Sequence, residues 1–157
     1  MLPPVRGHDA VFDRFRRTLS NGRLASTYLF TGPAGVGKRL FAHHLARALL
    51  CESPGDDPLI ACGTCQSCRL VDSGNHPDVL TVGLPKDKNL LSIDLFVGDR
   101  EHRHKKGFCH DLSLRPAIGS RRIGIIDDAD HLTQESANCL LKTLEEPPAG
   151  SVLILIG

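Results

Sequence analysis

A glycine-rich segment that ends in lysine offers the clearest chemistry in this sequence. Gly32-Pro33-Ala34-Gly35-Val36-Gly37-Lys38 follows a short apolar run and precedes a stretch with helical spacing. This is the pattern G-x-x-x-x-G-K, in which backbone N–H groups converge on phosphate oxygens and the lysine adds a positive charge. We predict a phosphate-binding loop, with a glycine-rich turn that binds nothing as the alternative. The candidate nucleotide-binding residues are Gly32, Gly35, Val36, Gly37, Lys38 and Arg39.

Arg39 departs from this pattern at its last position. Ser or Thr is expected there, because its hydroxyl ligates the Mg²⁺ that bridges the β- and γ-phosphates. Arginine cannot ligate a cation, and it adds a positive charge beside the place of the metal. We therefore expect magnesium-dependent hydrolysis to suffer more than simple phosphate binding, and ATP with Mg²⁺ stays an open cofactor assignment.

An acidic pair follows the most apolar interior run of the chain. Residues 123–126 lead directly into Asp127 and Asp128, which is the arrangement of a Walker B strand. Related ATPases usually place glutamate after the aspartate to polarise the attacking water, and Asp128 is one methylene shorter. A displacement of about 1 Å can cost about a hundredfold in rate. Asp127 and Asp128 thus form a degraded catalytic pair, and we do not expect hydrolysis to be the task of this chain.

Four clustered cysteines indicate a metal centre. Cys51, Cys62, Cys65 and Cys68 have the spacing C-x10-C-x2-C-x2-C. The two-residue spacers let neighbouring thiolates face one ion, and four sulfurs suit tetrahedral zinc in a closed structural site. An iron–sulfur cluster and four free thiols are the alternatives. The polar segment 51–68 has little apolar area to offset its ordering entropy, so we expect the metal to hold it in place.

Helices and strands alternate along the chain. Apolar periodicity predicts helices over 9–20, 38–50 and 133–145 and another that begins near 92–94, with strands at 27–31, 79–82, 123–126 and 151–156. This alternation predicts an α/β fold with a mostly parallel sheet covered on both faces. Thr133 is the expected cap of the last helix. The apolar stripe of that helix is predicted to be Ala137, Leu140, Leu141 and Leu144.

Composition narrows the class of protein. The chain has 157 residues, 24% charged and 41% hydrophobic, as expected for one globular domain rather than a disordered or fibrous one. It has no apolar run of about 18–20 residues and no signal peptide, so we expect a cytoplasmic protein without a membrane partner. Because it ends just after an apolar strand, we expect it to be the N-terminal portion of a longer protein.

The charge balance does not indicate a general polyanion binder. Nineteen basic residues face eighteen acidic ones, for a formal charge of +1. Contact with nucleic acid would therefore need a local patch. The stretch from Arg100 to Arg122 is the candidate, and a solvated helix face and loop is the alternative. Its basic residues are Arg100, Arg103, Lys105, Lys106, Arg115, Arg121 and Arg122.

In their order, these motifs resemble the bacterial clamp-loader subunits of DNA polymerase III, namely the delta-prime and gamma/tau subunits. The resemblance covers nearly the whole chain, with two departures: Ser26-Thr27 replaces the usual His-Ala, and Cys139 replaces alanine. Besides the phosphate loop and the four cysteines, it is carried by residues 5–8, 22–33, His76-Pro77-Asp78, 125–130 and 138–148.

The resemblance implies a P-loop NTPase fold of the AAA+, RecA-like type, a three-layer sandwich. Residues 1–157 would be an N-terminal AAA+ domain that stops before the lid and collar domains, with residues 51–68 as a zinc-binding insert. In this family gamma/tau subunits are ATPase motors, and delta-prime is a stator with an often degraded site. Arg39 and Asp128 favour delta-prime.

The implied function is therefore that of a non-hydrolysing clamp-loader subunit that helps load the sliding clamp onto primed DNA. The implied partners are the gamma/tau and delta subunits and, through them, the clamp and the DNA. An active ATPase motor of the same complex is the alternative. A zinc-dependent nucleic-acid-binding module is a third hypothesis.

Overall fold

The computed structural model describes residues 2–103 and 105–157, and in these residues four parallel strands form one sheet. The strands are β1 (Thr27–Phe30), β2 (Val79–Val82), β3 (Arg122–Ile126) and β4 (Ser151–Ile156). Their order across the sheet is β1-β4-β3-β2. The α/β class with a parallel sheet, predicted from the alternation of elements, is confirmed.

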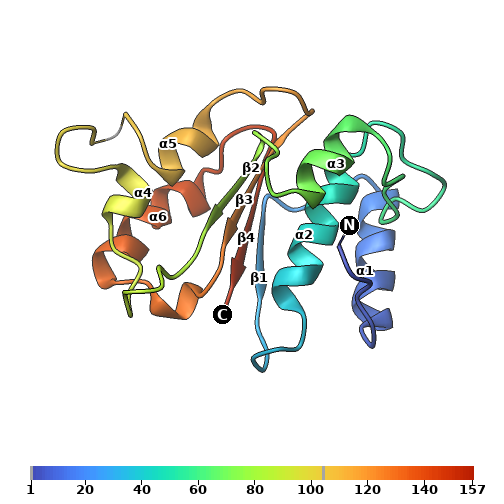
Figure 1. Ribbon diagram of the computed structural model, residues 1–157, viewed down its shortest axis with the longest axis horizontal. Coiled ribbons are helices and arrows are strands. Elements are labelled where there is room, and N and C mark those ends of the chain that lie inside the picture. Colours follow the sequence, from blue (N-terminus) through green and yellow to red (C-terminus); the bar gives the residue numbers. More distant parts are fainter. Residues whose placement is uncertain (1, 104) are drawn as a thin grey trace.

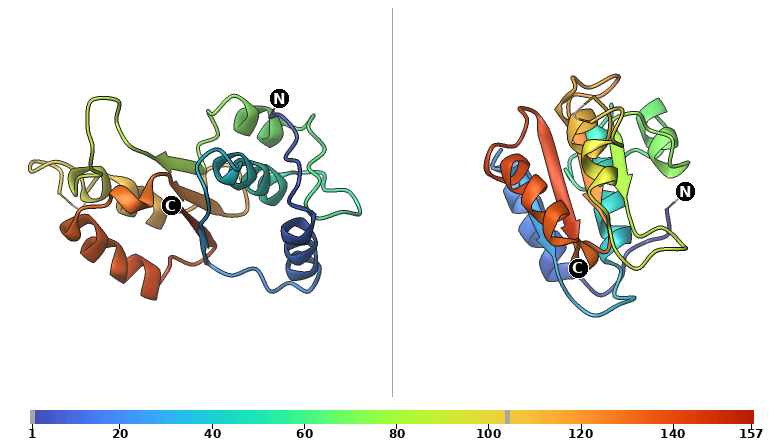
Figure 2. Two further views of the ribbon diagram at one scale, coloured as in Figure 1. Left: turned by 90° about the horizontal axis from the view of Figure 1, so that it is seen from below. Right: turned by 90° about the vertical axis from the view of Figure 1, so that its left-hand side faces the viewer.

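Helices cover both faces of this sheet and give the molecule three layers (Figure 1). One layer holds α1 (Asp9–Ser20), α2 (Lys38–Leu50) and α3 (Gln66–Asp72). The other holds α4 (Asp94–Val97), α5 (Phe108–Ser113) and α6 (Gln134–Glu145), with a 3-10 turn, η1 (Ala129–His131), before α6. Two further views show the sheet between the two helical layers (Figure 2).

Strand β3 lies in the interior of the sheet and is buried along its whole length. Ile123 and Ile125 pack into the core under α1 and α2, whereas Ile126 packs into the core under α4–α6. Gly124 allows a close approach, since a Cβ there would lie 2.7 Å from Cζ of Phe108. The strand that delivers Asp127 is therefore held by packed side chains on both faces.

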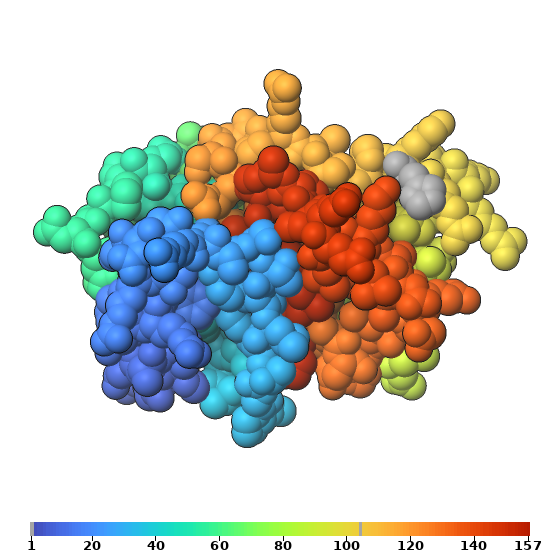
Figure 3. Space-filling model, turned by 180° about the vertical axis from the view of Figure 1, so that it is seen from behind, coloured from blue at the N-terminus to red at the C-terminus, as the bar shows by residue number. Residues whose placement is uncertain are grey.

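Strand β1 forms one edge of the sheet. Leu29 of this strand is 65% exposed. In the space-filling view from behind, the light-blue surface around β1 lies between α1 in darker blue and the orange-red surface that includes α6 (Figure 3). No helix in the described part of the chain has the length and hydropathy that a membrane span requires.

The structure corrects the predicted elements in three places. The short helix α3 begins inside the predicted insert, where Cys65 caps it by accepting the Cys68 N–H on its sulfur. The basic stretch contains α5, which the charged sequence on either side concealed. Leu141 is 50% exposed and does not belong to the apolar stripe of α6, whereas the Thr133 cap is confirmed by an N–H from Ser136 at 3.1 Å.

Candidate functional site

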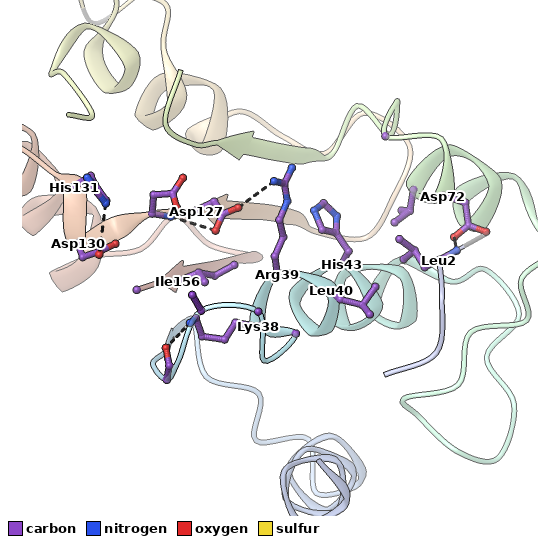
Figure 4. A pocket seen from close by; sticks show the side chains of 18 of the residues that line it. Leu2, Lys38, Arg39, Leu40, His43, Asp72, Asp127, Asp130, His131 and Ile156 are labelled. Carbon is purple, nitrogen blue, oxygen red and sulfur yellow. Dashed lines mark hydrogen bonds and ion pairs between the residues drawn. The ribbon is translucent and has the colours of Figure 1, made fainter. Parts of the chain in front are cut away.

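The glycine-rich loop and the acidic pair meet at the carboxyl end of the sheet. The loop joins β1 to α2, and Asp127 follows the end of β3. Between them lies a cleft of about 950 Å³, also lined by the end of β4 and the 3-10 turn (Figure 4). Ligands of open α/β sheets bind outside the carboxyl ends of the strands. The cleft therefore lies where the sequence motifs predicted a nucleotide site.

The loop backbone uses its glycines for left-handed turns. Gly35 and Gly37 have φ angles of +79° and +99°, which side-chain-bearing residues rarely adopt. Gly37 directly precedes the first residue of α2, and its carbonyl accepts the Phe41 N–H at 2.9 Å. The N-terminus of α2 thus opens toward the cleft, and its first turn contains no acidic residue.

Lys38 and Val36 are placed differently by this loop. The Lys38 ammonium folds back over the loop and donates to the carbonyls of Gly32 and Pro33, the second at 3.0 Å. Val36 faces a separate hollow of about 620 Å³ between α1 and β1. Its carbonyl lies 2.8 Å from Nε2 of His8, a contact that fastens the N-terminal segment to the loop.

Arg39 turns its guanidinium toward the acidic strand end (Figure 4). One of its terminal nitrogens lies 3.3 Å from Oδ2 of Asp127, in an ion pair whose arginine side chain is 66% exposed and whose aspartate is 14% exposed. The other carboxylate oxygen of Asp127 accepts the Asp128 N–H at 3.2 Å. Both oxygens of Asp127 therefore already have partners within the protein.

Mg²⁺ does not fit this arrangement. The ion requires near-octahedral oxygen ligands at about 2.1 Å. Position 39 supplies no oxygen from its side chain, and the Arg39 guanidinium occupies the approach to Oδ2 of Asp127. A divalent cation bound to Oδ2 of Asp127 would therefore have to displace the largely exposed Arg39 guanidinium.

The backbone conformation at position 128 suits aspartate. Its φ and ψ of 56° and 41° are left-handed, a region that aspartate tolerates better than most residues. Its Oδ2 accepts the Leu84 N–H at 3.2 Å, which links the end of β3 to the segment after β2. The carboxylate lines the cleft but is engaged by backbone, so it is poorly placed to polarise a water.

His43 is a cleft residue that sequence reasoning missed. It lies four residues after Arg39, so the two side chains leave the same face of α2. Burial lowers the pKa of His43, and the Arg39 guanidinium lowers it further against the opposing effect of Asp127. His43 is therefore favoured in its neutral form beside the ion pair. The i, i+4 spacing on a predicted helix was the signal that could have found it.

The four predicted cysteines form one cluster. The sulfurs of Cys51, Cys62, Cys65 and Cys68 all lie within 4.8 Å of one another. A tetrahedral centre with metal–sulfur bonds of about 2.3 Å places its sulfurs roughly 3.8 Å apart, so the cluster fits a single ion. Four cysteines are thus positioned to bind a metal ion.

Backbone N–H groups point at these sulfurs. The N–H of Cys62 donates to the sulfur of Cys51 at 3.3 Å, and the N–H of Cys65 donates to Cys62 at 3.4 Å. The N–H groups of Thr64 and Cys65 and the Thr64 hydroxyl lower the pKa of Cys62 to about 6. Burial raises the pKa of Cys68, the least exposed member. A cation at the centre would stabilise all four as thiolates.

His76 is not among the four residues of this cluster. Its Nδ1 accepts the Asp78 N–H at 3.1 Å, and its ring is buried at the start of β2. The insert also contributes more to the core than its polar sequence suggested. Leu59 is buried against α1 and α2, and Asp57 accepts a hydrogen bond from Nε of Arg16 at 2.6 Å.

The basic stretch is only partly a surface patch. Arg122 is buried, lies 3.9 Å from the Asp78 carboxylate and donates to the Arg115 carbonyl at 3.2 Å, so it belongs to the fold. Nε of Arg121 is also buried. The remaining exposed members are Arg100, Arg103, Lys105, Lys106 and Arg115. The patch is therefore smaller than the sequence indicated.

Comparison with known proteins decides the family. The family model described as "DNA polymerase III, delta subunit" matches residues 7–157. The chain belongs to this family. The delta-prime subunit of DNA polymerase III from Pseudomonas aeruginosa is 36% identical over 84% of this chain and 37% of its own length. The delta-prime subunit from Escherichia coli is 35% identical over 88% of this chain and 38% of its own length.

Gamma/tau-type proteins are similar as well. The tau subunit from Salmonella typhimurium is 34% identical over 92% of this chain and 20% of its own length. A crystal structure of a gamma-subunit-related protein from Thermotoga maritima superimposes with a TM-score of 0.58 at 20% identity, over 92% of this chain and 38% of the other. This likeness shows a similar overall fold. The chain spans less than two fifths of the length of each of these relatives.

Proposed function

We propose that this protein is a delta-prime-type subunit of the DNA polymerase III clamp loader, which helps load the sliding clamp onto primed DNA without hydrolysing ATP itself. The ion pair between Arg39 and Asp127 is the observation that carries the proposal. It puts a guanidinium where a hydrolysing site needs a magnesium ion. A carboxylate engaged in this way, beside an Asp128 held by Leu84, favours a stator over a motor.

The proposed domain organisation follows from the same family. Residues 1–157 form an N-terminal AAA+ domain, and lid and collar domains belong to the longer protein. Residues 51–68 form an insert that is held by zinc. Zinc is favoured over an iron–sulfur cluster because four thiolates in a closed tetrahedral set are typical of structural zinc.

The proposed partners are the gamma/tau and delta subunits in the cytoplasm and, through them, the sliding clamp and primed DNA. The names of the similar proteins, delta-prime and tau subunits of DNA polymerase III, support this assembly. The exposed basic residues beside α5 are a candidate contact for DNA within it.

The test is ATP turnover by the full-length protein, alone and after reconstitution with gamma/tau and delta. We expect turnover by the isolated protein to lie at least about a hundredfold below that of gamma/tau, and Lys38→Ala to leave it unchanged. Clamp loading by the reconstituted complex should require the protein. Turnover comparable to that of gamma/tau, lost on Lys38→Ala, would contradict the stator assignment.

An ATPase motor of the same complex is the second candidate. The loop from Gly32 to Lys38 keeps every glycine and the lysine of the motif, and tau subunits are among the similar proteins. The Lys38→Ala comparison separates the two candidates, because only a motor loses turnover by that change.

A further inference from the structure

We infer that the cleft binds the phosphate tail of a nucleoside di- or triphosphate as a metal-free anion, with the Arg39 guanidinium in the role that Mg²⁺ has in hydrolysing sites. The inference rests on the proposed nucleotide-type cleft and names the form of ligand that it takes. It starts from a mismatch in this cleft: the phosphate loop keeps its glycines and lysine, whereas an arginine occupies the position of the hydroxyl that ligates the metal.

The phosphate-binding half gathers positive charge at the start of α2. Lys38 and Arg39 are the first two residues of α2, and the helix N-terminus adds its own partial charge. The Lys38 ammonium is at present satisfied by two loop carbonyls. Phosphate oxygens would replace these carbonyls as stronger, charged acceptors.

The acidic half would repel a bare anion if its charges were unopposed. The cleft is lined by Asp127, Asp128 and Asp130. Arg39 is paired with the first of these, Leu84 N–H donates to the second, and the third lies 3.7 Å from a ring nitrogen of His131. The Asp127 carboxylate is thus already paired with a protein cation rather than left for a metal.

The guanidinium can serve both groups at once. Arginine carries five N–H donors in a planar fork, of which the ion pair at 3.3 Å involves one terminal nitrogen. With 66% of the side chain exposed, the other donors are free to meet phosphate oxygens entering the cleft. Arg39 would thus bridge Asp127 and the phosphate tail, as a metal would, but without the charge and ligand geometry that hydrolysis needs.

The experiment measures ATP and ADP binding to the full-length protein by calorimetry, with and without magnesium. Magnesium is omitted rather than chelated, so that the cysteine cluster keeps its metal, and metal content and circular dichroism are checked for every variant. We expect the affinities for ATP with and without Mg²⁺ to agree within about threefold.

Variants at two arginines make the test specific. Arg39→Thr restores the hydroxyl of the motif, so affinity without magnesium should fall at least about tenfold and added magnesium should recover it. Arg17→Thr, on the exposed face of α1, makes the same change in charge away from the cleft and should behave as the wild type. Lys38→Ala should lose binding under both conditions.

Two results would overturn the inference. One is wild-type binding that magnesium strengthens about tenfold or more, and the other is no measurable binding under either condition. Neither result involves turnover, so both would leave the stator assignment standing. Conversely, ATP turnover would contradict the stator whatever the magnesium dependence of binding.

Discussion

The two ends of the sheet treat their charged groups in opposite ways. At the amino end, Asp78 is fully buried and accepts three backbone N–H groups, from Ala117, Ile118 and Gly119, at 2.5–2.9 Å. At the carboxyl end, Asp127 lines an open cleft and pairs with an exposed guanidinium. The same residue type therefore anchors the fold at one end and lines an open cleft at the other.

The cysteine insert extends this contrast. It follows α2 at the amino end of the sheet, at the opposite end of that helix from the phosphate loop (Figure 1). Its four sulfurs form a complete ligand set for one ion, whereas the cleft lacks an oxygen at position 39 for magnesium. The two places therefore differ in whether all the expected donors for a metal are present.

The largest loss of stability is expected when one cysteine of the cluster is replaced. Cys65→Ser removes one of four thiolates and the sulfur that caps α3, so we expect the bound metal to be lost. Stability should fall by about 3 kcal/mol or more, which lowers Tm by about 6–12 °C in a domain of this size. Metal analysis and thermal denaturation measure both.

The matched control is Cys139→Ser. Cys139 lies on α6, outside the cluster, where burial raises the pKa of its thiol to about 11. This variant should keep one equivalent of metal per chain. Metal-free wild-type protein with an unchanged Tm would show that the cluster is not a structural centre.

The next largest effect is expected from Asp78→Asn, at the amino end of the sheet. Asp78→Asn replaces one acceptor oxygen by an NH₂ group that faces backbone N–H donors, and it removes the charge beside Arg122. We expect a loss of about 2–4 kcal/mol in urea denaturation, because buried donors are left without acceptors. Asp87→Asn, on an exposed loop, should change stability by less than about 0.5 kcal/mol.

Acid should erase the difference between wild type and Asp78→Asn. Burial alone would raise the pKa of Asp78, but the three N–H donors and Arg122 outweigh it and hold the pKa below its usual value. A carboxylate with a lowered folded pKa contributes stability above its unfolded value near 4, and this contribution is lost as pH falls through the folded value. Denaturation from pH 7 to pH 2 should show the two proteins converging only below about pH 4, and a constant difference would contradict this account.

The smallest effect is expected from Asp127→Asn. Its partner Arg39 is largely exposed, and such ion pairs contribute about 0–1 kcal/mol. Urea denaturation should therefore change by less than about 1 kcal/mol, well below the loss from Asp78→Asn. An equal loss at both positions would mean that the two ends of the sheet do not differ in the way proposed.

Several features of this protein could be predicted from local sequence patterns. The spacing of glycines, lysine and cysteines is set by ligand geometry, and it indicated the loop and the cluster before any fold was known. The bounds of α2, β2 and β4 followed from periodicity and from Gly and Pro at their ends. The predicted defect at Arg39 also needed no structure, because the missing hydroxyl is a property of the residue itself.

The sequence did not reveal which side chains contact one another in the fold. Arg122 counted as a surface charge until the structure placed the buried Asp78 carboxylate beside it. Leu141 counted as core, but in the structure half of its surface is exposed. Short helices such as α3 and α5 carry too few residues for periodicity to show.

The sequence by itself determined which chemical groups are present and which is missing: the phosphate loop, four clustered thiols and no hydroxyl at position 39. Only the tertiary structure decided that Arg39 reaches the carboxylate of Asp127, which lies far away along the chain. The physical reason is that parallel strands bring the ends of distant segments to one edge of the sheet. Pairing across that edge depends on strand order and register, which local spacing does not encode.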